Sequence, residues 1–293
     1  MKESFIKELA NIVGRENVLS SKRDLLAYSY DATQHQEMPE VVVFPRSVAE
    51  ASAVLKAAHR EQIPIVPRGA GTGISGGTVP IRGGLVLELS RMNTILDMDT
   101  ANRRAVAEPG VVNLDLQDAL APLGFFYPPD PASQKSCTMG GNVGENAGGP
   151  LCLRYGVTSK YVCGLEVVLP NGEVVNLGGS VEDIPGYDLR ALLIGSEGTL
   201  GIATKLVLHI LPKSEASQTM LAIFDNLDAA SQTVSDIIGA GIIPNALELM
   251  DKAMCEVIEQ GVQAGYPTDA EGVLLIQVAG VADSIDRQVK EIS

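Results

Sequence analysis

The sequence predicts an α+β protein with two domains, and three observations lead to this expectation. A chain of 293 residues is long enough for about two domains with their own cores. Between Val41 and Val66 a strand, a helix and a second strand follow one another, which indicates a right-handed parallel crossover. Farther along, Asn171-Gly172 lies between two apolar, β-branched runs and predicts an antiparallel hairpin with a two-residue turn.

Helices in the first domain are expected where apolar residues recur at helical spacing. The pattern from Phe5 to Val13 predicts one or two helices within residues 1–30. A second helix is expected at 47–62, because Ser47 is followed three residues later by Glu50, the signature of a capping box.

A third helix is expected at 114–123, with Asn113 as its N-cap and Gly124 just past its end. The segments between these helices are short and rich in β-branched residues, so we expect them to be strands. The expected strands are 41–44, 63–66, 84–89, 103–111, 163–169, 173–177 and 201–211.

The pattern of the sequence changes at Ser214, where strands and helices begin to alternate. We therefore expect one domain at 1–213 and a second at 214–293. The last helix begins near Ser284 and continues to Ser293 without a cap, a glycine stop or a closing strand. The second domain is thus expected to be incomplete, as in a fragment or one piece of a split protein. Its other expected elements are strands at 219–224, 246–250 and 273–278 and helices at 228–240 and 252–261.

The composition excludes several classes of protein. Hydrophobic residues make up 45% of the chain and charged residues 20%, as in ordinary globular proteins. A net charge of −14 and a pI of about 4.6 argue against nucleic acid or an anionic membrane as the main partner. No apolar run approaches the ~18 residues of a membrane-spanning helix. The N-terminus is charged where a signal peptide would be apolar, so we expect a cytoplasmic protein.

The cysteines predict neither a disulfide framework nor a metal site. No C-x-x-C pair occurs, and no histidine lies nearby to complete a zinc set. We therefore expect free thiols at all four positions, which are Cys137, Cys152, Cys163 and Cys255.

Two segments are unusually rich in glycine. PRGAGTGISGG (67–77) has five glycines in eleven residues, and GGNVGENAGG (140–149) has five in ten. Glycine lets the backbone adopt a positive φ or approach a ligand closely, and the main-chain N–H groups of such loops bind anions. We therefore expect two loops that hold a phosphate-bearing ligand.

Common nucleotide-binding motifs do not explain the first of these loops. Residues 71–76 match G-x-G-x-x-G, but the dinucleotide fingerprint requires a helix to begin at these glycines. Here Gly77 leads through Pro80 into a strand instead. No lysine follows the glycines in a Walker pattern, which argues against a nucleoside triphosphate.

Several further strings occur in a fixed order: PRSVAEASAVLKAAHREQIPIVPRGAGTGISGG, PPDP, SCTMGGNVGENAGGP, RYG and GYDLRALLIGSEGTLGIATKLVLHILP. Over residues 40–212 they resemble the FAD-linked oxidases of the vanillyl-alcohol-oxidase or p-cresol methylhydroxylase type. The closest likeness is to the branch with the glycolate oxidase FAD subunit and the D-lactate and D-2-hydroxyglutarate dehydrogenases. This resemblance implies an FAD-binding domain of two subdomains, at about 40–100 and 101–213, followed by a partial ferredoxin-like substrate cap.

The resemblance also implies which residues bind FAD. The first glycine loop would surround the pyrophosphate: Pro67, Arg68, Gly69, Ala70, Gly71, Thr72, Gly73, Gly76 and Gly77. Residues of the second subdomain would line the flavin and ribityl groups: Pro129, Asp130, Ser136, Thr138, Gly140, Gly141, Asn142, Gly144 and Asn146. Residues in GSEGTLGI would close on the adenosine or the ring: Glu197, Gly201 and Ile202.

Some proteins of this type attach FAD to a histidine in the first loop. Thr72 occupies that position here, so we predict non-covalent FAD. By resemblance, the reaction is oxidation of a 2-hydroxy acid, such as glycolate or D-lactate, to the 2-keto acid. The Cα hydrogen would pass as hydride to flavin N5 while a base takes the hydroxyl proton.

The sequence assigns no catalytic residue. In this branch the base and the metal-binding histidines lie in a C-terminal H-x-H-x-G-type stretch, which does not occur here. The three histidines, His35, His59 and His209, are expected to be a loop residue, a helix-end residue and a strand residue without catalytic roles. The isolated chain could therefore lack turnover of its own.

Other functions stay open at this stage. The chain could be an FAD-binding or electron-relay subunit, with catalysis on a separate partner and with an iron-sulfur or electron-transfer subunit as its electron acceptor. It could also be a remnant that binds neither flavin nor substrate. Within the enzymes, another reaction on the same flavin fold, such as sugar-nucleotide reduction, is the remaining alternative.

Overall fold

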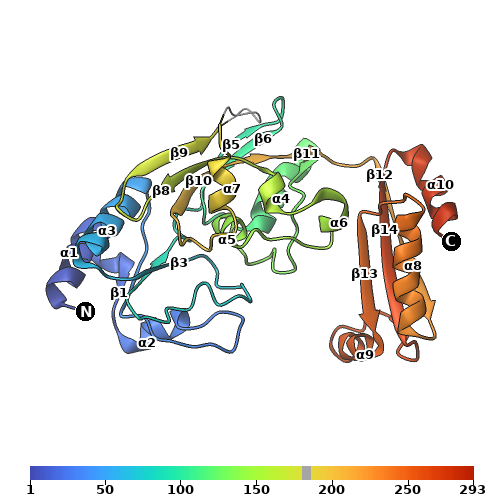
Figure 1. The fold of residues 1–293 in the computed structure, drawn as a ribbon, viewed down its shortest axis with the longest axis horizontal. Coiled ribbons are helices and arrows are strands. Elements are labelled where there is room, and N and C mark those ends of the chain that lie inside the picture. The colour runs from blue at the N-terminus through green and yellow to red at the C-terminus, as the bar shows by residue number, and fades with distance from the viewer. Residues whose placement is uncertain (180–185) are drawn as a thin grey trace. The chain divides into compact units, whose positions relative to one another are not determined.

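The computed structural model describes residues 1–179 and 186–293 (Figure 1). Contacts between Cα atoms divide the chain into two compact units. The first unit contains Met1–Gly148 and Val157–Leu211, and the second contains Gly149–Gly156 and Pro212–Ser293. Sheets and helices occur in both, so the expected α+β class is confirmed. No helix among the described residues is long and apolar enough to cross a membrane.

A four-stranded sheet in the order β1-β2-β4-β3 lies in the first unit. Strands β2, β4 and β3 are parallel, whereas β1 runs antiparallel to β2. Helix α3 (Val48–Glu61) connects β2 to β3, so the expected parallel crossover is present, with β4 inserted between its two strands. The strand bounds are β1 Val18–Leu19, β2 Val41–Val43, β3 Ile65–Arg68 and β4 Leu85–Glu88.

Helix α3 begins as its sequence predicts, with one difference. Ser47 Oγ accepts a hydrogen bond from the Glu50 amide at 3.2 Å. The Glu50 carboxylate, however, accepts from the Arg46 amide at 2.7 Å rather than from Ser47. The apolar stripe of α3 is buried in one core cluster with helix α1 (Glu3–Val13) and strands β2 and β4.

The N-terminal region contains a short strand as well as helices. After α1 the chain forms a 3-10 turn at Arg15–Asn17 and then strand β1, which pairs with β2. Helix α2 (Lys22–Leu25) and a 3-10 turn at Leu26–Tyr28 follow. The prediction of one or two helices within residues 1–30 is confirmed by α1 and α2, but it did not include strand β1, which forms because it pairs with β2.

A five-stranded antiparallel sheet in the order β5-β6-β10-β8-β9 completes the core of the first unit. Its hairpin, β8–β9, has a turn of three residues, Pro170 to Gly172, because the Leu169 amide bonds to the Glu173 carbonyl at 2.8 Å. The expected two-residue turn was wrong, since Pro170 has no N–H to give to the ladder. The bounds are β5 Ile95–Asp99, β6 Arg104–Ala107, β8 Val162–Val168, β9 Val174–Gly178 and β10 Ile202–His209.

The sequence predicted Asn113 as the N-cap of helix α4 (Asn113–Leu120), and this prediction was wrong. Val112 occupies the N-cap, and the buried Asn113 amide instead donates to the Pro129 carbonyl at 3.1 Å. Asn113 therefore ties the start of α4 to the segment around Pro129. The other elements of this unit are a 3-10 turn at Ala121–Leu123, strand β7 (Phe125–Phe126), helices α5 (Met139–Glu145) and α7 (Leu189–Leu193), and a 3-10 turn at Thr158–Lys160.

The second unit contains a three-stranded sheet in the order β12-β14-β13 (Figure 1). Strands β12 and β13 both run antiparallel to the central strand β14, and the expected alternation of strands and helices is confirmed. Ile237 of α8 packs against Leu274 and Ile276 of β14. The bounds are α6 Cys152–Tyr155, β12 Ala216–Phe224, α8 Leu227–Gly239, β13 Ala246–Asp251, α9 Lys252–Gly261, β14 Gly272–Gly280 and α10 Ala282–Ile292. Strand β11 (Leu211–Pro212) lies where the chain passes from the first unit to the second.

Side-chain hydrogen bonds join the short segment with helix α6 to the rest of the second unit. Arg154 Nη1 donates to Asn245 Oδ1 and to the Ala279 carbonyl, each at 2.6 Å. The Asn245 amide in turn donates to the Tyr155 hydroxyl at 3.5 Å. These bonds join α6 to strand β14 and to the residue before β13.

Candidate functional site

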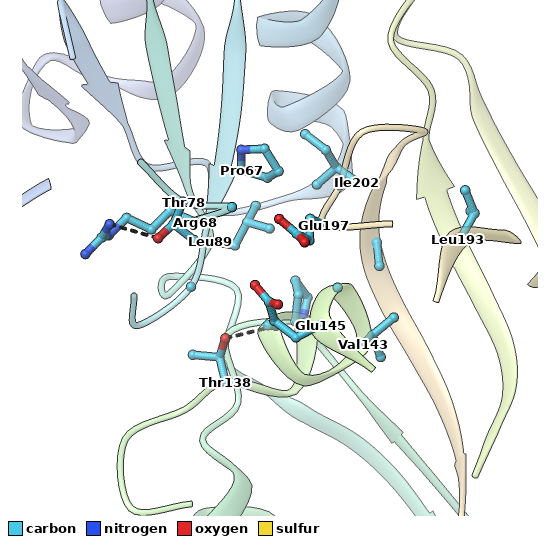
Figure 2. A pocket seen from close by; sticks show the side chains of 18 of the residues that line it. Pro67, Arg68, Thr78, Leu89, Thr138, Val143, Glu145, Leu193, Glu197 and Ile202 are labelled. Carbon is cyan, nitrogen blue, oxygen red and sulfur yellow. Dashed lines mark hydrogen bonds between the residues drawn. The ribbon is translucent and has the colours of Figure 1, made fainter. Parts of the chain in front are cut away.

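A pocket in the first unit is lined mainly by three segments that are far apart in the sequence (Figure 2). They are the first glycine-rich segment, helix α5 within the second one, and the stretch around Glu197. The lining residues are Pro67, Arg68, Gly69, Gly77, Thr78, Leu89, Pro109, Thr138, Gly140, Gly141, Val143, Gly144, Glu145, Leu165, Leu193, Glu197, Gly198, Gly201, Ile202 and Ala203.

The two glycine-rich segments meet at this pocket. A Cβ atom added at Gly69 would overlap Thr138 Oγ1, so the two backbones approach as closely as they do only because Gly69 has no side chain. Ser75 Oγ of the first segment also donates to Glu145 Oε2 at 2.7 Å. The pairing of these two segments, which the sequence separates by about seventy residues, is thus direct.

The first glycine-rich segment is irregular, whereas the second begins as a helix. Residues 69–78 form neither helix nor strand, so no helix begins at the G-x-G-x-x-G match, as expected. Thr138 caps helix α5, because its Oγ1 accepts from the Gly141 amide at 3.3 Å. The expectation of a second loop was therefore wrong for Met139–Glu145. An N-cap and close packing of Gly140 on Pro109 outweigh the poor helix propensity of glycine.

The stretch before strand β10 is held against helix α5 by its backbone. The Gly195 amide donates to the Val143 carbonyl and the Glu197 amide to the Gly144 carbonyl, each at 2.9 Å. Glu197 adopts a positive φ of 53°, an uncommon conformation for a residue with a side chain. This backbone directs the Glu197 side chain into the pocket, where Figure 2 shows it facing Glu145.

The charges in the pocket are unbalanced. Arg68 is the one lysine or arginine among the described lining residues, and the two carboxylates of Glu145 and Glu197 face each other. Partial burial raises the pKa of Glu197, and the neighbouring Glu145 charge raises it further. The rest of the lining is largely apolar, with Leu89, Val143 and Ile202 among the side chains.

Of the residues that the sequence suggested for the cofactor, a majority line this pocket. They are Pro67, Arg68, Gly69, Gly77, Thr138, Gly140, Gly141, Gly144, Glu197, Gly201 and Ile202. Gly76 lines a neighbouring cavity together with Gly77 and Glu197.

The other suggested residues lie outside the lining of the main pocket. In the first glycine-rich segment they are Ala70, Gly71, Thr72 and Gly73, and elsewhere they are Pro129, Asp130, Ser136, Asn142 and Asn146. Asn146 has a structural role, because it ends helix α5 with a φ of 50° and its Oδ1 accepts from the Ser159 amide at 2.8 Å. The side chain of Asn142 is buried within the fold.

Sequence reasoning missed Glu145, although both Gly144 and Asn146 were considered. The sequence does mark Glu145, because it is the one charged residue inside GGNVGENAGG. Other lining residues that it missed carry no recognisable chemistry in the sequence: Thr78, Leu89, Pro109, Val143, Leu165, Leu193, Gly198 and Ala203.

The histidines and cysteines lie where the sequence placed them. His35 is exposed in a loop, His59 is exposed near the end of α3, and His209 ends strand β10. None of the three lines the main pocket. All four cysteines are free thiols, as expected: Cys137, Cys163 and Cys255 are buried, and Cys152 is partly buried.

Comparison with known families shows the family to which this chain belongs. A family model described as "FAD binding domain" matches residues 39–178, which include both glycine-rich segments. A second, described as "FAD linked oxidases, C-terminal domain", matches residues 213–293. The chain is a member of the FAD-linked oxidases. The second match falls on the part of the chain with strands β12 to β14.

Relatives of the chain include a glycolate oxidase subunit and a D-lactate dehydrogenase. The chain is 48% identical over 288 residues to the "Glycolate oxidase subunit GlcD" of Bacillus subtilis, a match covering 98% of this chain and 61% of the relative. It is 41% identical over 237 residues to a "D-lactate dehydrogenase" of Anaerostipes hadrus, covering 80% of this chain and 50% of the relative. The chain thus spans about three fifths or less of the length of these relatives.

The fold is that of a solved p-cresol methylhydroxylase with bound substrate. The TM-score is 0.73 at 20% identity, and the match covers 99% of this chain and 62% of that one. This likeness confirms the expected type of fold.

Proposed function

We propose that this chain holds FAD in the pocket between its two glycine-rich segments, as part of an oxidoreductase that converts a 2-hydroxy acid to a 2-keto acid. The observation that carries the proposal is the convergence of Gly69 and Gly77 with helix α5 at one pocket. The family matches and the named relatives support FAD, and the relatives favour glycolate or D-lactate as the type of substrate.

The residues of the pocket fit a bulky ligand that approaches the backbone. A Cβ added at Gly144 would meet only Glu197 Cα, at 3.8 Å, and one at Gly141 would meet only Thr138 Oγ1, at 3.2 Å. Both glycines therefore leave room on the pocket side of α5. The apolar lining suits the flat ring of a flavin. The two carboxylates repel phosphate, and Glu145 and Glu197 lie beside Ser75 and Gly77. We therefore place the pyrophosphate toward the Gly69–Gly71 end of the first glycine-rich segment.

Bound FAD would supply the electron acceptor for oxidation of the hydroxyl carbon. The part of this chain is to bind and orient it: the glycines allow close approach, and Leu89, Val143 and Ile202 exclude water from the ring. Since no histidine or cysteine is among the described residues that line the pocket, we propose that FAD is held without a covalent bond.

A second candidate function rests on the name of one relative. The Bacillus subtilis protein is a glycolate oxidase subunit, which favours a multi-subunit enzyme. In this alternative the chain binds FAD or relays electrons, and a partner polypeptide completes catalysis.

The test is a flavin titration of the purified chain. We expect FAD to be retained with the visible spectrum of a bound flavin, and to be released into the filtrate when the protein is denatured. Glycolate and D-lactate are then added in separate anaerobic samples. Bleaching would favour the oxidoreductase over the relay subunit for this chain alone. A folded sample that takes up no FAD would contradict both.

A further inference from the structure

Arg68 is a buried cation at the end of strand β3. Its exposed fraction is 6%, and its guanidinium lies 5.8 Å from the centre of the Tyr28 ring. Arg68 Nη1 donates to Thr78 Oγ1 at 3.3 Å. In the part of the chain that the structure describes, no carboxylate forms a direct ion pair with it. A buried arginine is usually paired, so this one calls for an explanation.

The guanidinium occupies the inside of the first glycine-rich segment. Gly71 has a φ of +68°, and a Cβ added there would overlap Arg68 Nη2. Thr78, which accepts from Arg68, directly follows the segment. Arg68 thus contacts the segment at Gly71 and the chain just after it at Thr78, on the side away from Glu145 and Glu197 (Figure 2).

The other contacts of the segment are few: Gly69 packs on Thr138, and Ser75 Oγ donates to Glu145 Oε2 at 2.7 Å. Its residues 69–78 form no helix or strand. Two carbonyls of the segment accept backbone hydrogen bonds. The Ala32 amide donates to the Gly73 carbonyl at 3.1 Å, and the Val79 amide donates to the Gly76 carbonyl at 3.0 Å. A loop of this length and glycine content would otherwise have high conformational entropy.

Electrostatics keep the guanidinium in place despite its burial. Burial lowers the pKa of Arg68, and the buried carboxylates of Glu88 and Asp31 oppose that effect through their charge. Arginine stays protonated at any ordinary pH, so the site holds a permanent positive charge with a planar set of donors. A planar fork can contact two parts of a loop at once, which a lysine ammonium does less well.

We propose that Arg68 is a positioning residue that holds the first glycine-rich segment in the shape that binds the cofactor. The claim that Arg68 orders the segment stands on the geometry alone. Its consequence for FAD rests on the proposed function.

The experiment measures loop order and FAD affinity separately. Hydrogen exchange of the Ala32 and Val79 amides, without added FAD, reports whether the segment keeps its shape. Titration with FAD reports affinity. The variants are Arg68→Met, which removes the charge and the fork, and Arg68→Lys, which keeps the charge alone. The control is Arg91→Met, since Arg91 also lies over an aromatic ring, Phe44, but outside the segment.

In Arg68→Met we expect both amides to exchange at least tenfold faster and the Kd for FAD to rise at least tenfold. Arg68→Lys should show both changes to a smaller degree, and Arg91→Met should leave both within twofold. Arg68→Lys alone decides the matter if Arg68→Met does not fold.

Two results would overturn the proposal. One is unchanged exchange with weakened FAD binding, which would make Arg68 a direct electrostatic partner of FAD. The other is no change in either quantity. If the unaltered chain binds no FAD but Arg68→Met still speeds exchange, the proposed function fails while the positioning role stands.

Discussion

The two glycine-rich segments have nearly the same glycine content but different backbones. Residues 67–77 and 140–149 each contain five glycines. The first segment is irregular from residue 69 onward, whereas the second begins as helix α5. In the first, glycine permits a positive φ at Gly71 around the Arg68 side chain. In the second, it permits a helix to lie directly on Pro109 and beside the pocket.

The comparison shows what glycine density does and does not predict. It predicts that backbone comes close to something, because a missing Cβ is the shared property. It does not predict the conformation, which depends on neighbours such as the Thr138 cap and the Pro109 surface. Within α5 itself, Gly140 and Gly144 both line the pocket, but a Cβ at Gly140 would overlap Pro109, whereas one at Gly144 would meet only Glu197 Cα. Substitutions at these two glycines can therefore separate packing from ligand binding.

The largest effect is expected from Gly140→Val. A Cβ at this position would lie 2.5 Å from Pro109 Cβ and 3.0 Å from the Pro109 carbonyl oxygen. Because backbone has to move, we expect the free energy of unfolding to fall by about 3 kcal/mol. Urea unfolding at 25 °C measures it. A change below about 0.5 kcal/mol would show that α5 does not pack on Pro109.

Gly144→Val is the matched change on the pocket side of the same helix. A Cβ there meets only Glu197 Cα at 3.8 Å, an ordinary contact. We expect stability within about 1 kcal/mol of the unaltered chain and an FAD Kd at least tenfold higher, about 1.4 kcal/mol. Flavin titration and urea unfolding are run on one preparation. Equal FAD affinity in the variant would place the cofactor elsewhere.

Thr138→Ala tests the feature that makes the second segment helical. The variant loses the hydrogen bond from the Gly141 amide, and we expect about 1 kcal/mol less stability. Thr138→Ser keeps an acceptor in the same place and should recover most of this difference. If serine and alanine behave alike in urea unfolding, the methyl group rather than the cap matters at this position.

The smallest effect is expected from Glu197→Gln and depends on pH. The pKa of Glu197 is raised in the folded chain, so between its unfolded and folded pKa values the folded state binds more protons. Its contribution to stability therefore falls as the pH rises through the folded pKa. Glu197→Gln should be slightly more stable than the unaltered chain at pH 7, and this advantage should vanish toward pH 4.

The control for this pH effect is Glu248→Gln, a change of an exposed carboxylate in the second unit. Its unfolding free energy should follow that of the unaltered chain across the same pH range. An advantage of Glu197→Gln that stays constant with pH would mean that packing, not charge, separates the two variants.

The sequence predicted the order of most elements because their signals are local. The stripe of α3, most strands of the larger sheets and the alternation after Ser214 all depend on side-chain periodicity, whereas strand β5 was not predicted. The sequence-based prediction was wrong where a residue or strand far away in the sequence determines the local structure. Strand β1 exists because β2 lies beside it, and Asn113 turns from a cap to the carbonyl of Pro129. Such partners leave no mark in the surrounding residues.

The candidate site was predictable in outline for a different reason. The motifs that resemble a family mark three segments, and these segments do line one pocket. What the motifs could not supply is which way each side chain points. Asn146 and Gly144 lie two residues apart, but a left-handed helix end turns Asn146 toward Ser159 while Gly144 lines the pocket. Glu145 was missed because its direction depends on the same helix end.

The two units are not two consecutive stretches of chain, and Arg154, which hydrogen-bonds to Asn245 and Ala279, lies within the segment that crosses over. The polypeptide leaves the first unit after Gly148, contributes eight residues to the second, and returns at Val157 before leaving again after Leu211. A chain cut at Leu211 would therefore keep helix α6 but lose Asn245 and Ala279, the acceptors of its arginine. Anyone who wishes to express the first unit alone should replace residues 149–156 by a short polar linker rather than only shorten the chain.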